Sequence, residues 1–473
     1  MLLRGLEMTA DVHEQAAAGI DEQQTQSKIG RGRHRLDVPD SPLMEKIQDW
    51  ILMHNVEHLH GPEEVDYDID ELVVLVLLRN GRPYIKPFVE HYFSLGVKHI
   101  VFLDNGSTDG TIEALKAYDD QKITVLRSKL SFKKYNITMK QYLVERFGQG
   151  RWTLSVDIDE LFEYPYSNVV SLKALLRYLN EHSYTAVVTY MLDMFPETLL
   201  PAESPAAEYE DLKELHRFYE ISDVRTWDYN DGGDIGNVVA NEEIDVLQGG
   251  VIQRIFRTSP LLTKHPLLFL DEKLKPHDLS DHWVGNASIA DFTAVFLHYK
   301  LSANLYELVR REIEEERRYQ NLHGKYDRIY EVLKEAPSLL IRNDTSKELK
   351  SVNDLVGTRF VSVSRRYMNF VDEEERKKEG LYSEQKRSER LFEAFFNARS
   401  EVTAYSKRVR ELEQQLKELR RNNGAMGSRS AKEQLRAIQS SRTWKVFTMV
   451  VRLNIGVRSA LGRLRRRGLQ REG

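Results

Sequence analysis

The sequence predicts an α/β fold with a doubly wound, mostly parallel sheet, followed by a helical C-terminal third. Two observations support the sheet: apolar runs typical of buried strands alternate with stretches of helical spacing between residues 71 and 191, and polar loops follow several of these runs. A third observation, a heptad pattern of apolar residues after residue 385, supports the helical part.

Strands are expected where short apolar runs lie between turn residues. Residues 71–78 are apolar at almost every position, as is typical of a strand buried on both faces. The other expected strands are 98–103, 123–126, 151–156, 184–191 and 250–257, and the expected helices are 83–95, 112–118, 135–147 and 171–180. Because strands and helices alternate over the first part, a parallel sheet is expected there.

The most informative motif is Asp157-Ile158-Asp159, which follows the expected strand 151–156. Residues two apart in an extended chain face the same side, so the two carboxylates converge. Open α/β sheets bind ligands at the carboxyl ends of their strands. Magnesium is commonly held by one or two carboxylates together with substrate phosphates. The pair therefore predicts a metal-bridged nucleotide site, and a strand-end turn with solvated carboxylates is the alternative.

Two further loops follow expected strands. Arg79-Asn80-Gly81 ends the first strand, and Asp104-Asn105-Gly106-Ser107 begins the loop after the second. Glycine and asparagine favour a tight turn, whereas Ser, Thr and Asp can cap the next helix, so an ordinary capping turn remains an alternative. Arg79 is either a phosphate-side cation or a plain strand-end charge. Three polar strand ends in succession favour a ligand site.

Taken in this order, the three motifs resemble glycosyltransferase family 2-like enzymes of bacterial type with the GT-A fold. The likeness covers about residues 70–165 well and 245–305 more loosely, and this chain has Asn80-Gly81 where the family commonly has Asn-Glu. The resemblance implies that Asp104 contacts the nucleotide base and that Asp157 and Asp159 hold Mn²⁺ or Mg²⁺ on the diphosphate. The donor-binding set that it implies is Arg79, Asn80, Asp104, Asn105, Gly106, Ser107 and Asp157.

The expected activity is metal-dependent, inverting transfer of a sugar from a nucleotide-diphosphate sugar to a hydroxyl of a glycan, lipid-linked or other acceptor, as in cell-surface polysaccharide biosynthesis. A bound divalent ion would neutralise the leaving diphosphate, and the acceptor hydroxyl would have to be placed and deprotonated. One alternative is a non-catalytic nucleotide-sugar-binding scaffold, which the intact Asp pair disfavours. Another is a phosphohydrolase, which is disfavoured because the pair follows the fourth strand and precedes Glu160.

The later part of the chain offers candidate catalytic residues around Asp281-His282-Trp283 and at His298. These segments resemble those that close the active site in related bacterial enzymes. Asp281 is a candidate general base, and His282 lies between a carboxylate and an aromatic ring suited to sugar recognition. His298 is a candidate third metal ligand, although a lone strand histidine is more often a hydrogen-bonded structural group.

The C-terminal third is expected to mediate association and membrane contact. Residues 420–473 hold fourteen Lys and Arg against two Glu, while the whole chain has a net charge of −5. An Arg-rich segment with Trp444 and other apolar anchors suits an anionic lipid surface, with packing on the protein as the alternative. The heptad seam predicts a homo-oligomer, with a helix folded back on its own domain as the alternative, and comprises Leu391, Phe395, Ala398, Val402, Tyr405, Val409, Leu412, Leu416 and Leu419.

Composition sets the expected location and domain plan. The chain has no cysteine, which excludes disulfides and fits a reducing cytoplasm. No run approaches the ~20 apolar residues of a membrane span, so the protein is expected to be cytoplasmic, with peripheral contact at the inner face of the plasma membrane. No recognised nucleic-acid-binding fold accompanies the arginines, so no nucleic-acid partner is expected. The expected segments are a disordered N-terminus 1–45, a glycosyltransferase domain 46–330, an extension 331–384, a coiled coil 385–421 and a basic tail 422–473.

Overall fold

The structure is a computed structural model, and it describes residues 51–52, 54–199, 209–232, 236–280, 282–314, 320–336, 338–380 and the single residues 386, 407, 414 and 433. The chain divides into two units, Met1–Glu375 and Arg376–Gly473, and the elements discussed below belong to the first, except that a helix over residues 365–380 crosses the boundary. The expected N-terminal segment 1–45 lies outside the described residues. So do the coiled coil 385–421 and the tail 422–473, apart from the four single residues.

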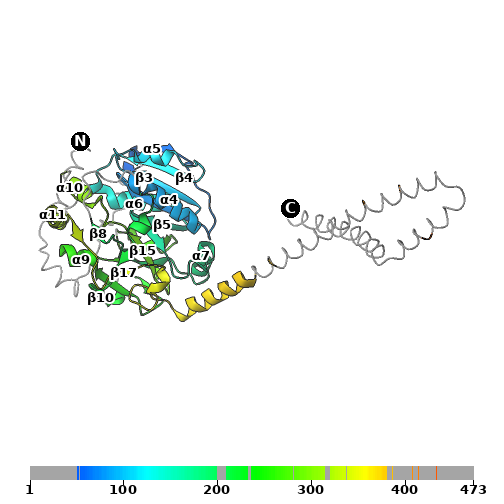
Figure 1. The fold of residues 1–473 in the computed structure, drawn as a ribbon. Coiled ribbons are helices and arrows are strands. Elements are labelled where there is room, and N and C mark those ends of the chain that lie inside the picture. Colours follow the sequence, from blue (N-terminus) through cyan, green and yellow to red (C-terminus); the bar gives the residue numbers. More distant parts are fainter. Residues whose placement is uncertain are drawn as a thin grey trace. The chain divides into compact units, whose positions relative to one another are not determined.

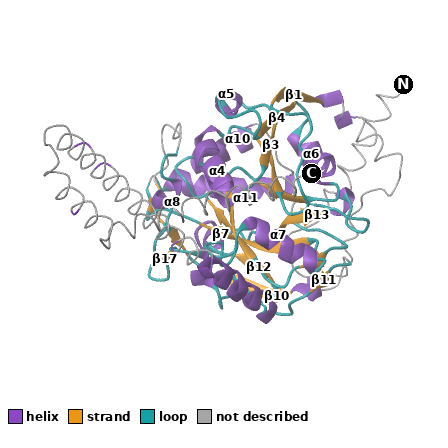
Figure 2. Ribbon diagram, turned by 90° about the vertical axis from the view of Figure 1, so that its right-hand side faces the viewer, coloured by secondary structure: helices purple, strands orange, loops and turns teal. Residues whose placement is uncertain are grey.

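A mixed, mostly parallel sheet forms the centre of the first unit (Figure 2). Its strands are β1 (Val56–His60), β2 (Leu72–Leu78), β3 (His99–Asp104), β4 (Ile123–Ser128), β5 (Trp152–Val156), β6 (Glu160–Glu163), β7 (Ala186–Asp193), β11 (Val238–Val239), β13 (Thr263–Phe269), β14 (Ser288–Ile289) and β15 (Ala294–His298). The order is β1-β4-β3-β2-β5-β13-β7-β14-β11, and β15 pairs with β6 and β7. Strands β4, β3, β2 and β5 are parallel, whereas β13 runs antiparallel to both β5 and β7. The predicted mixed α/β fold with a mostly parallel sheet is confirmed.

Helices lie on both sides of this sheet (Figures 1 and 2). They are α4 (Arg82–Leu95), α5 (Thr111–Lys116), α6 (Phe132–Gly148), α7 (Leu172–Glu181), α8 (Leu212–Leu215), α9 (Val251–Phe256), α10 (Leu305–Glu314) and α11 (Gln320–Glu335). Helix α4 begins with Pro83 in its first turn and ends at Gly96, whose φ of 97° lies in the left-handed region that favours glycine. These are the ends that the sequence predicts.

Register brings the carboxyl ends of the central strands level. Leu78 at the end of β2 pairs with Asp104 at the end of β3, and Val76 pairs with Val156 at the end of β5. All seven residues of β2 are buried, which explains its continuous apolar sequence. The loops that follow β2, β3 and β5 therefore emerge at one edge of the sheet.

The strand expected at 250–257 is wrong. Strand β12 (Asp245–Gly249) ends just before this segment, and Val251–Phe256 forms helix α9. Gly249 and Gly250 both have positive φ, which turns the chain between the two elements. Val251, Ile252 and Phe256 are buried in a second apolar cluster, whereas Arg254 bonds to Glu220 at 3.0 Å. A short apolar run fits either period, so tertiary packing decides.

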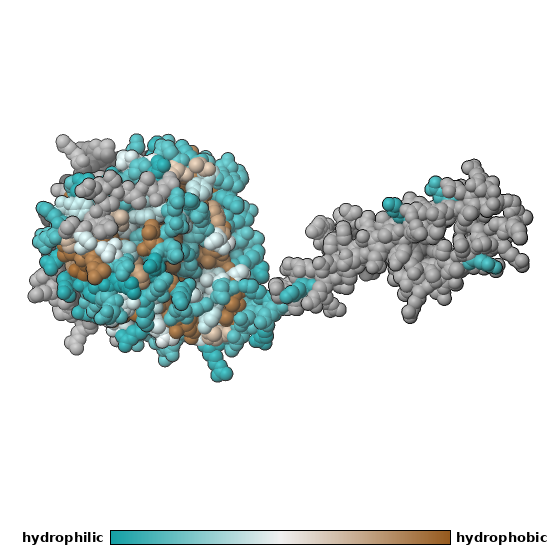
Figure 3. All heavy atoms as spheres, viewed as in Figure 1, coloured by the Kyte–Doolittle hydropathy of each residue, from teal (hydrophilic) through white to brown (hydrophobic). Residues whose placement is uncertain are grey.

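Residues beyond 335 also pack into the first unit. Strand β16 (Leu339–Leu340) pairs with β8 (Thr198–Leu199), and β17 (Lys347–Glu348) pairs with β9 (Phe218–Tyr219). Other elements are β10 (Val224–Asp228), paired with β12, the short 3₁₀ turns η1 (Tyr229–Gly232), η2 (Pro276–Asp278) and η3 (Val352–Leu355), and a helix over residues 365–380. In Figure 3, the face of this unit in view is largely hydrophilic with scattered apolar side chains. Over the described residues, no helix combines the length and apolarity that crossing a membrane requires.

Candidate functional site

Two side chains at the start of the loop after β3 form hydrogen bonds that fix its shape. Asp104 is fully buried, and its Oδ2 accepts the backbone N–H groups of Gly106 and Ser107, each at 2.9 Å. Asn105 donates its side-chain amide to the carbonyls of Ser128 and Leu130, at 3.1 and 2.9 Å. In this structure Asp104 therefore fixes the turn, and its predicted contact with a nucleotide base stays a prediction.

The loop after β2 is hydrogen-bonded to the loop after β3. The N–H of Asn80 donates to Ser107 Oγ at 2.8 Å, and the N–H of Thr108 donates to Asn80 Oδ1 at 2.9 Å. The N–H of Gly81 donates to Thr111 Oγ1 at 3.0 Å. Asn80 adopts φ 54°, a left-handed conformation that asparagine tolerates well. These bonds join two of the three predicted motifs, and Arg79 lies half-buried directly after β2.

Gly81 brings the third motif into contact. A Cβ atom added at Gly81 would lie 2.9 Å from Leu78 Cδ1 and 3.1 Å from Ile158 Cγ1, the residue between the two aspartates. Its φ of −95° is an ordinary value, so the close packing is what calls for glycine here. Ile158 therefore fills the space beside Gly81.

Charged side chains surround the Asp pair. Lys264 places Nζ 2.6 Å from Glu160 Oε1 and 3.2 Å from Asp157 Oδ2, and Lys140 Nζ lies 3.4 Å from Asp157 Oδ1. The N–H of Asp157 donates to Glu160 Oε2 at 3.1 Å. Lys264 lies on β13 just before Pro266, where the pairing with β7 is irregular because proline has no N–H to donate.

His298 lies beside Asp159, the second aspartate of the pair. On β15 it pairs with Glu160 of β6 and Asp193 of β7. Its Nδ1 lies 2.6 Å from Asp193 Oδ1, and its Nε2 lies 3.7 Å from Asp159 Oδ2. We call Asp157, Asp159, Glu160, Asp193, Lys264 and His298 the ionic edge.

Burial and neighbouring charges act on the ionic edge in different ways. Burial raises the pKa of Glu160, and the adjacent Lys264 opposes but does not cancel this effect. For His298, burial lowers the pKa, but the hydrogen bond to Asp193 and the negative charges of Asp159, Asp193 and Glu160 outweigh it, so its pKa is raised.

The predicted metal set of Asp157, Asp159 and His298 stays a prediction. Among the described residues, no group of three or more His, Asp or Glu side chains is placed to hold a metal ion. His298 turns one ring nitrogen toward Asp193, and Asp157 contacts two lysines. The oxygen donors that the sequence proposes for the metal ion are the carboxylates of Asp157 and Asp159.

A neutral aromatic cluster lies on the other side of β13. His265 Nδ1 lies 2.9 Å from the carbonyl oxygen of His282, which can only accept, so Nδ1 carries the proton. Its Nε2 then accepts from the Tyr229 hydroxyl at 2.6 Å. Burial lowers the pKa of His265 to about 4, and Trp283 packs against its ring. His282 bonds to the carbonyl of Thr263 at 3.0 Å. Asp281, the candidate base, lies outside the described residues.

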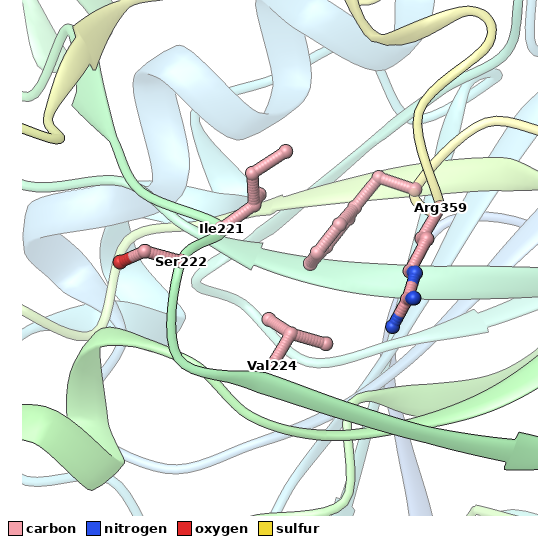
Figure 4. A pocket seen from close by; sticks show the side chains of 5 residues that line it. Ile221, Ser222, Val224 and Arg359 are labelled. Atoms are coloured by element: carbon pink, nitrogen blue, oxygen red, sulfur yellow. The ribbon is translucent and has the colours of Figure 1, made fainter.

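Two cavities lie away from the ionic edge. One, of about 230 Å³, has Ile221 and Val224 on one side and Arg359 on the other (Figure 4). The second, of about 190 Å³, lies beside Glu163 and Tyr299.

Three members of the ionic edge carry no role in the sequence prediction: Glu160, Asp193 and Lys264. Asp193 follows an apolar strand, the same signal that identified the other strand ends. Lys264 is a buried lysine in a strand that is otherwise mostly apolar, and such a residue is rarely fully buried unless it is paired. Their partners lie in distant parts of the sequence, so these ion pairs could be identified only once the fold was known.

Comparisons with known proteins do not place the chain in a family. No protein-family model matches it, and no curated protein does. Among solved structures, HddC from Yersinia pseudotuberculosis aligns with 26% of this chain and 59% of its own, at 10% identity and a TM-score of 0.20. A UDP-glucose pyrophosphorylase complexed with UDP-glucose aligns with 32% of this chain and 67% of its own, at 11% identity and a TM-score of 0.18. The chain thus spans about 59% of the length of HddC, and likenesses this low carry no argument about function.

Proposed function

We propose that the protein is a metal-dependent glycosyltransferase that uses a nucleotide-diphosphate sugar as its donor and a hydroxyl of a glycan or a lipid-linked molecule as its acceptor. One observation carries the proposal: the loops after β2, β3 and β5 interlock at one edge of the sheet. Asn80 bonds to Ser107, and Gly81 packs against Ile158 between the two aspartates. Ligands of open α/β sheets bind at such an edge.

Asp157 and Asp159 would hold Mn²⁺ or Mg²⁺. Carboxylate oxygens suit both ions, and a site with two protein ligands leaves positions for substrate phosphates and water. When bound, the ion would neutralise charge on the leaving diphosphate.

The remaining residues of the edge would bind and orient the donor. Backbone and side-chain groups at Asn80 and at the loop of residues 104–111 would face the nucleotide, with Arg79 beside the phosphates. In this structure, Lys264 and His298 lie against the carboxylates of the ionic edge and balance part of their negative charge. A divalent ion would take over part of that neutralisation. His282 and Trp283 would contact the acceptor, and inversion at the sugar would follow from direct attack by the acceptor hydroxyl.

A non-catalytic nucleotide-sugar-binding scaffold is the second candidate. It would use the same interlocked loops to bind the donor and would need no general base. The two candidates agree on donor binding and differ on turnover.

The test is calorimetric titration of nucleoside diphosphates with and without Mn²⁺, followed by transfer and hydrolysis assays with a panel of nucleotide sugars. Asp157→Asn should weaken metal-dependent donor binding, and Asp159→Asn should abolish transfer while leaving the thermal unfolding transition intact. Asp120→Asn, an exposed aspartate outside the edge, is the matched control and should behave like the parent.

Equal metal-dependent affinity for the parent and an Asp157→Asn/Asp159→Asn double variant would overturn the metal assignment. Donor binding that needs both aspartates, without transfer or hydrolysis of any donor, would instead support the scaffold.

A further inference from the structure

The cavity of about 190 Å³ lies apart from the ionic edge. It is lined by Leu297 and Tyr299 of the β15 region, which alternate with His298. Side chains of successive residues in an extended chain point to opposite faces, so the cavity is on the other face of the sheet from His298. A ligand in this cavity would not share the space proposed for the donor.

Among the charged side chains that line this cavity, cations outnumber anions, and apolar side chains such as Met194 and Val352 complete the lining. Lys213, Arg217 and Lys350 line it, and Glu163 is the one acidic residue in the same lining. Ser167 and Ser351 add hydroxyl groups. Arg217 also faces the exposed Glu348 at 3.6 Å, and Lys213 faces Glu163 at 3.3 Å, so Lys350 supplies the net positive charge of the lining.

Lys213 is held in place at the cavity by buried groups. Its Nζ lies 3.2 Å from His91 Nδ1 and 3.3 Å from Glu163 Oε1. His91 is buried, and its Nε2 donates to the carbonyl of Phe162 at 2.9 Å, which leaves Nδ1 as an acceptor for the ammonium group. Burial and the charge of Lys213 lower the pKa of His91 to about 4, so the ring is neutral at pH 7 and can play this role. Ordering an ammonium group before a ligand arrives reduces the entropic cost of binding.

We propose that this cavity binds a small molecule carrying a phosphate group. Two lysines, an arginine and the Ser351 hydroxyl supply donors that a phosphate accepts, whereas the Ser167 hydroxyl donates to Glu163 at 3.4 Å. Charge-assisted hydrogen bonds are the stronger kind. The volume is below the ~300–1,000 Å³ of sites for drug-sized ligands, which limits the occupant to a phosphate with a small substituent. The inference does not depend on the proposed glycosyltransferase activity.

The experiment is titration of the full-length protein with inorganic phosphate, followed by calorimetry, in the presence of EDTA and at constant ionic strength. The chelator removes metal-dependent binding at Asp157 and Asp159. Lys350→Gln should weaken phosphate binding roughly two- to fivefold, the size expected for one largely exposed ion pair, and Lys213→Gln should weaken it at least as much. Glu163→Gln should tighten it, because it removes the one acidic side chain of the lining.

Two variants serve as controls. Lys347→Gln removes an exposed lysine three positions before Lys350 that does not line the cavity, and Asp157→Asn alters the ionic edge. Neither should change phosphate binding. Equal affinities for the Lys350→Gln and Lys347→Gln proteins, or no saturable phosphate binding to the parent, would overturn the proposal. Acetate and a sugar 1-phosphate, titrated in parallel, complete the test: tighter binding of the sugar phosphate identifies a phosphomonoester as the ligand, whereas acetate as tight as phosphate would refute phosphate recognition.

Discussion

The two halves of the strand-end edge satisfy their polar groups in different ways. In the loops after β2 and β3, polar side chains bond mostly to backbone groups: Asp104 to two N–H groups, Asn105 to two carbonyls and Asn80 to the N–H of Thr108. In the ionic edge, side chains bond mostly to other side chains of opposite charge, as Lys264 does with Asp157 and Glu160.

This difference indicates how each half responds to a ligand. A loop built on backbone hydrogen bonds keeps its shape when a charge arrives, because its groups are already paired locally. A cluster of buried charges is sensitive to each added or removed charge, since the surrounding medium screens it poorly. The first half therefore suits a preformed nucleotide cradle, and the second suits a metal and a diphosphate.

The largest effect is expected from removing the central cation of the ionic edge. Lys264→Met leaves the buried carboxylate of Glu160 without its 2.6 Å partner. Breaking a buried ion pair costs about 3–5 kcal/mol, and this loss should appear in the free energy of unfolding measured by urea denaturation at pH 7. Lys264→Met/Glu160→Gln should recover much of the loss, because no unpaired buried charge remains at that position. If Lys264→Met were as stable as the parent, the carboxylate of Glu160 would have to be solvated.

The second prediction concerns pH, because two successive residues of β13 differ in charge. His265 follows Lys264 directly but is neutral, with its pKa lowered to about 4 by burial. As pH falls from 6.5 to about 4, the unfolded chain gains a proton that the folded chain refuses, so stability is lost over this window. The loss from this one residue is about 3 kcal/mol. In His265→Gln, the free energy of unfolding should fall less over the same window.

The third prediction concerns His298, whose contribution to stability changes with pH in the opposite direction to that of His265. Its pKa is raised in the folded protein, so its contribution to stability is fully present below the unfolded value and is lost as pH rises through the folded one. His298→Gln should therefore flatten the alkaline side of the stability profile and leave the acid side unchanged. If both histidine variants altered the same side of the profile, the contrast between their surroundings would be refuted.

Between residues 71 and 191, the sequence predicted the strands and helices except the short strand β6 (Glu160–Glu163), because buried parallel strands and amphipathic helices have distinct periods. It also identified the loops that converge at the edge. It could not predict that β13 enters between β5 and β7, nor that Lys264 reaches Asp157, because these contacts join residues 73 or more positions apart. The helix at Val251–Phe256 was missed because six residues are too few to separate the two periods.

A smaller effect tests the contact between the two halves. In Gly81→Ala, the added methyl group would press on Leu78 Cδ1 at 2.9 Å and on Ile158 Cγ1 at 3.1 Å. Overpacking of this kind costs about 1–3 kcal/mol. Because Ile158 lies between the two aspartates, metal-dependent donor binding should weaken as well. Gly324→Ala is a control for the effect of glycine replacement on donor binding, since no atom lies within 4 Å of its added Cβ and its φ is outside the left-handed region. Unchanged donor binding by the Gly81 variant would show that the position of Ile158 does not matter to the site.

The smallest effect is expected within the hydrogen-bonded half. Ser107→Ala removes the oxygen that accepts the N–H of Asn80 at 2.8 Å, and a single hydrogen bond of this kind contributes about 0.5–1.5 kcal/mol to stability. Ser107 is only half-buried, so water can replace part of that bond and the loss should fall at the lower end. Ser131→Ala is the matched control, because Ser131 also precedes a helix but its side chain makes no capping bond. The free energies of unfolding of the two variants should therefore differ by less than about 1.5 kcal/mol. Nucleoside diphosphate binding without metal should weaken only in Ser107→Ala, because only that loop is proposed to face the nucleotide; equal binding by both variants would exclude Ser107 from the donor site.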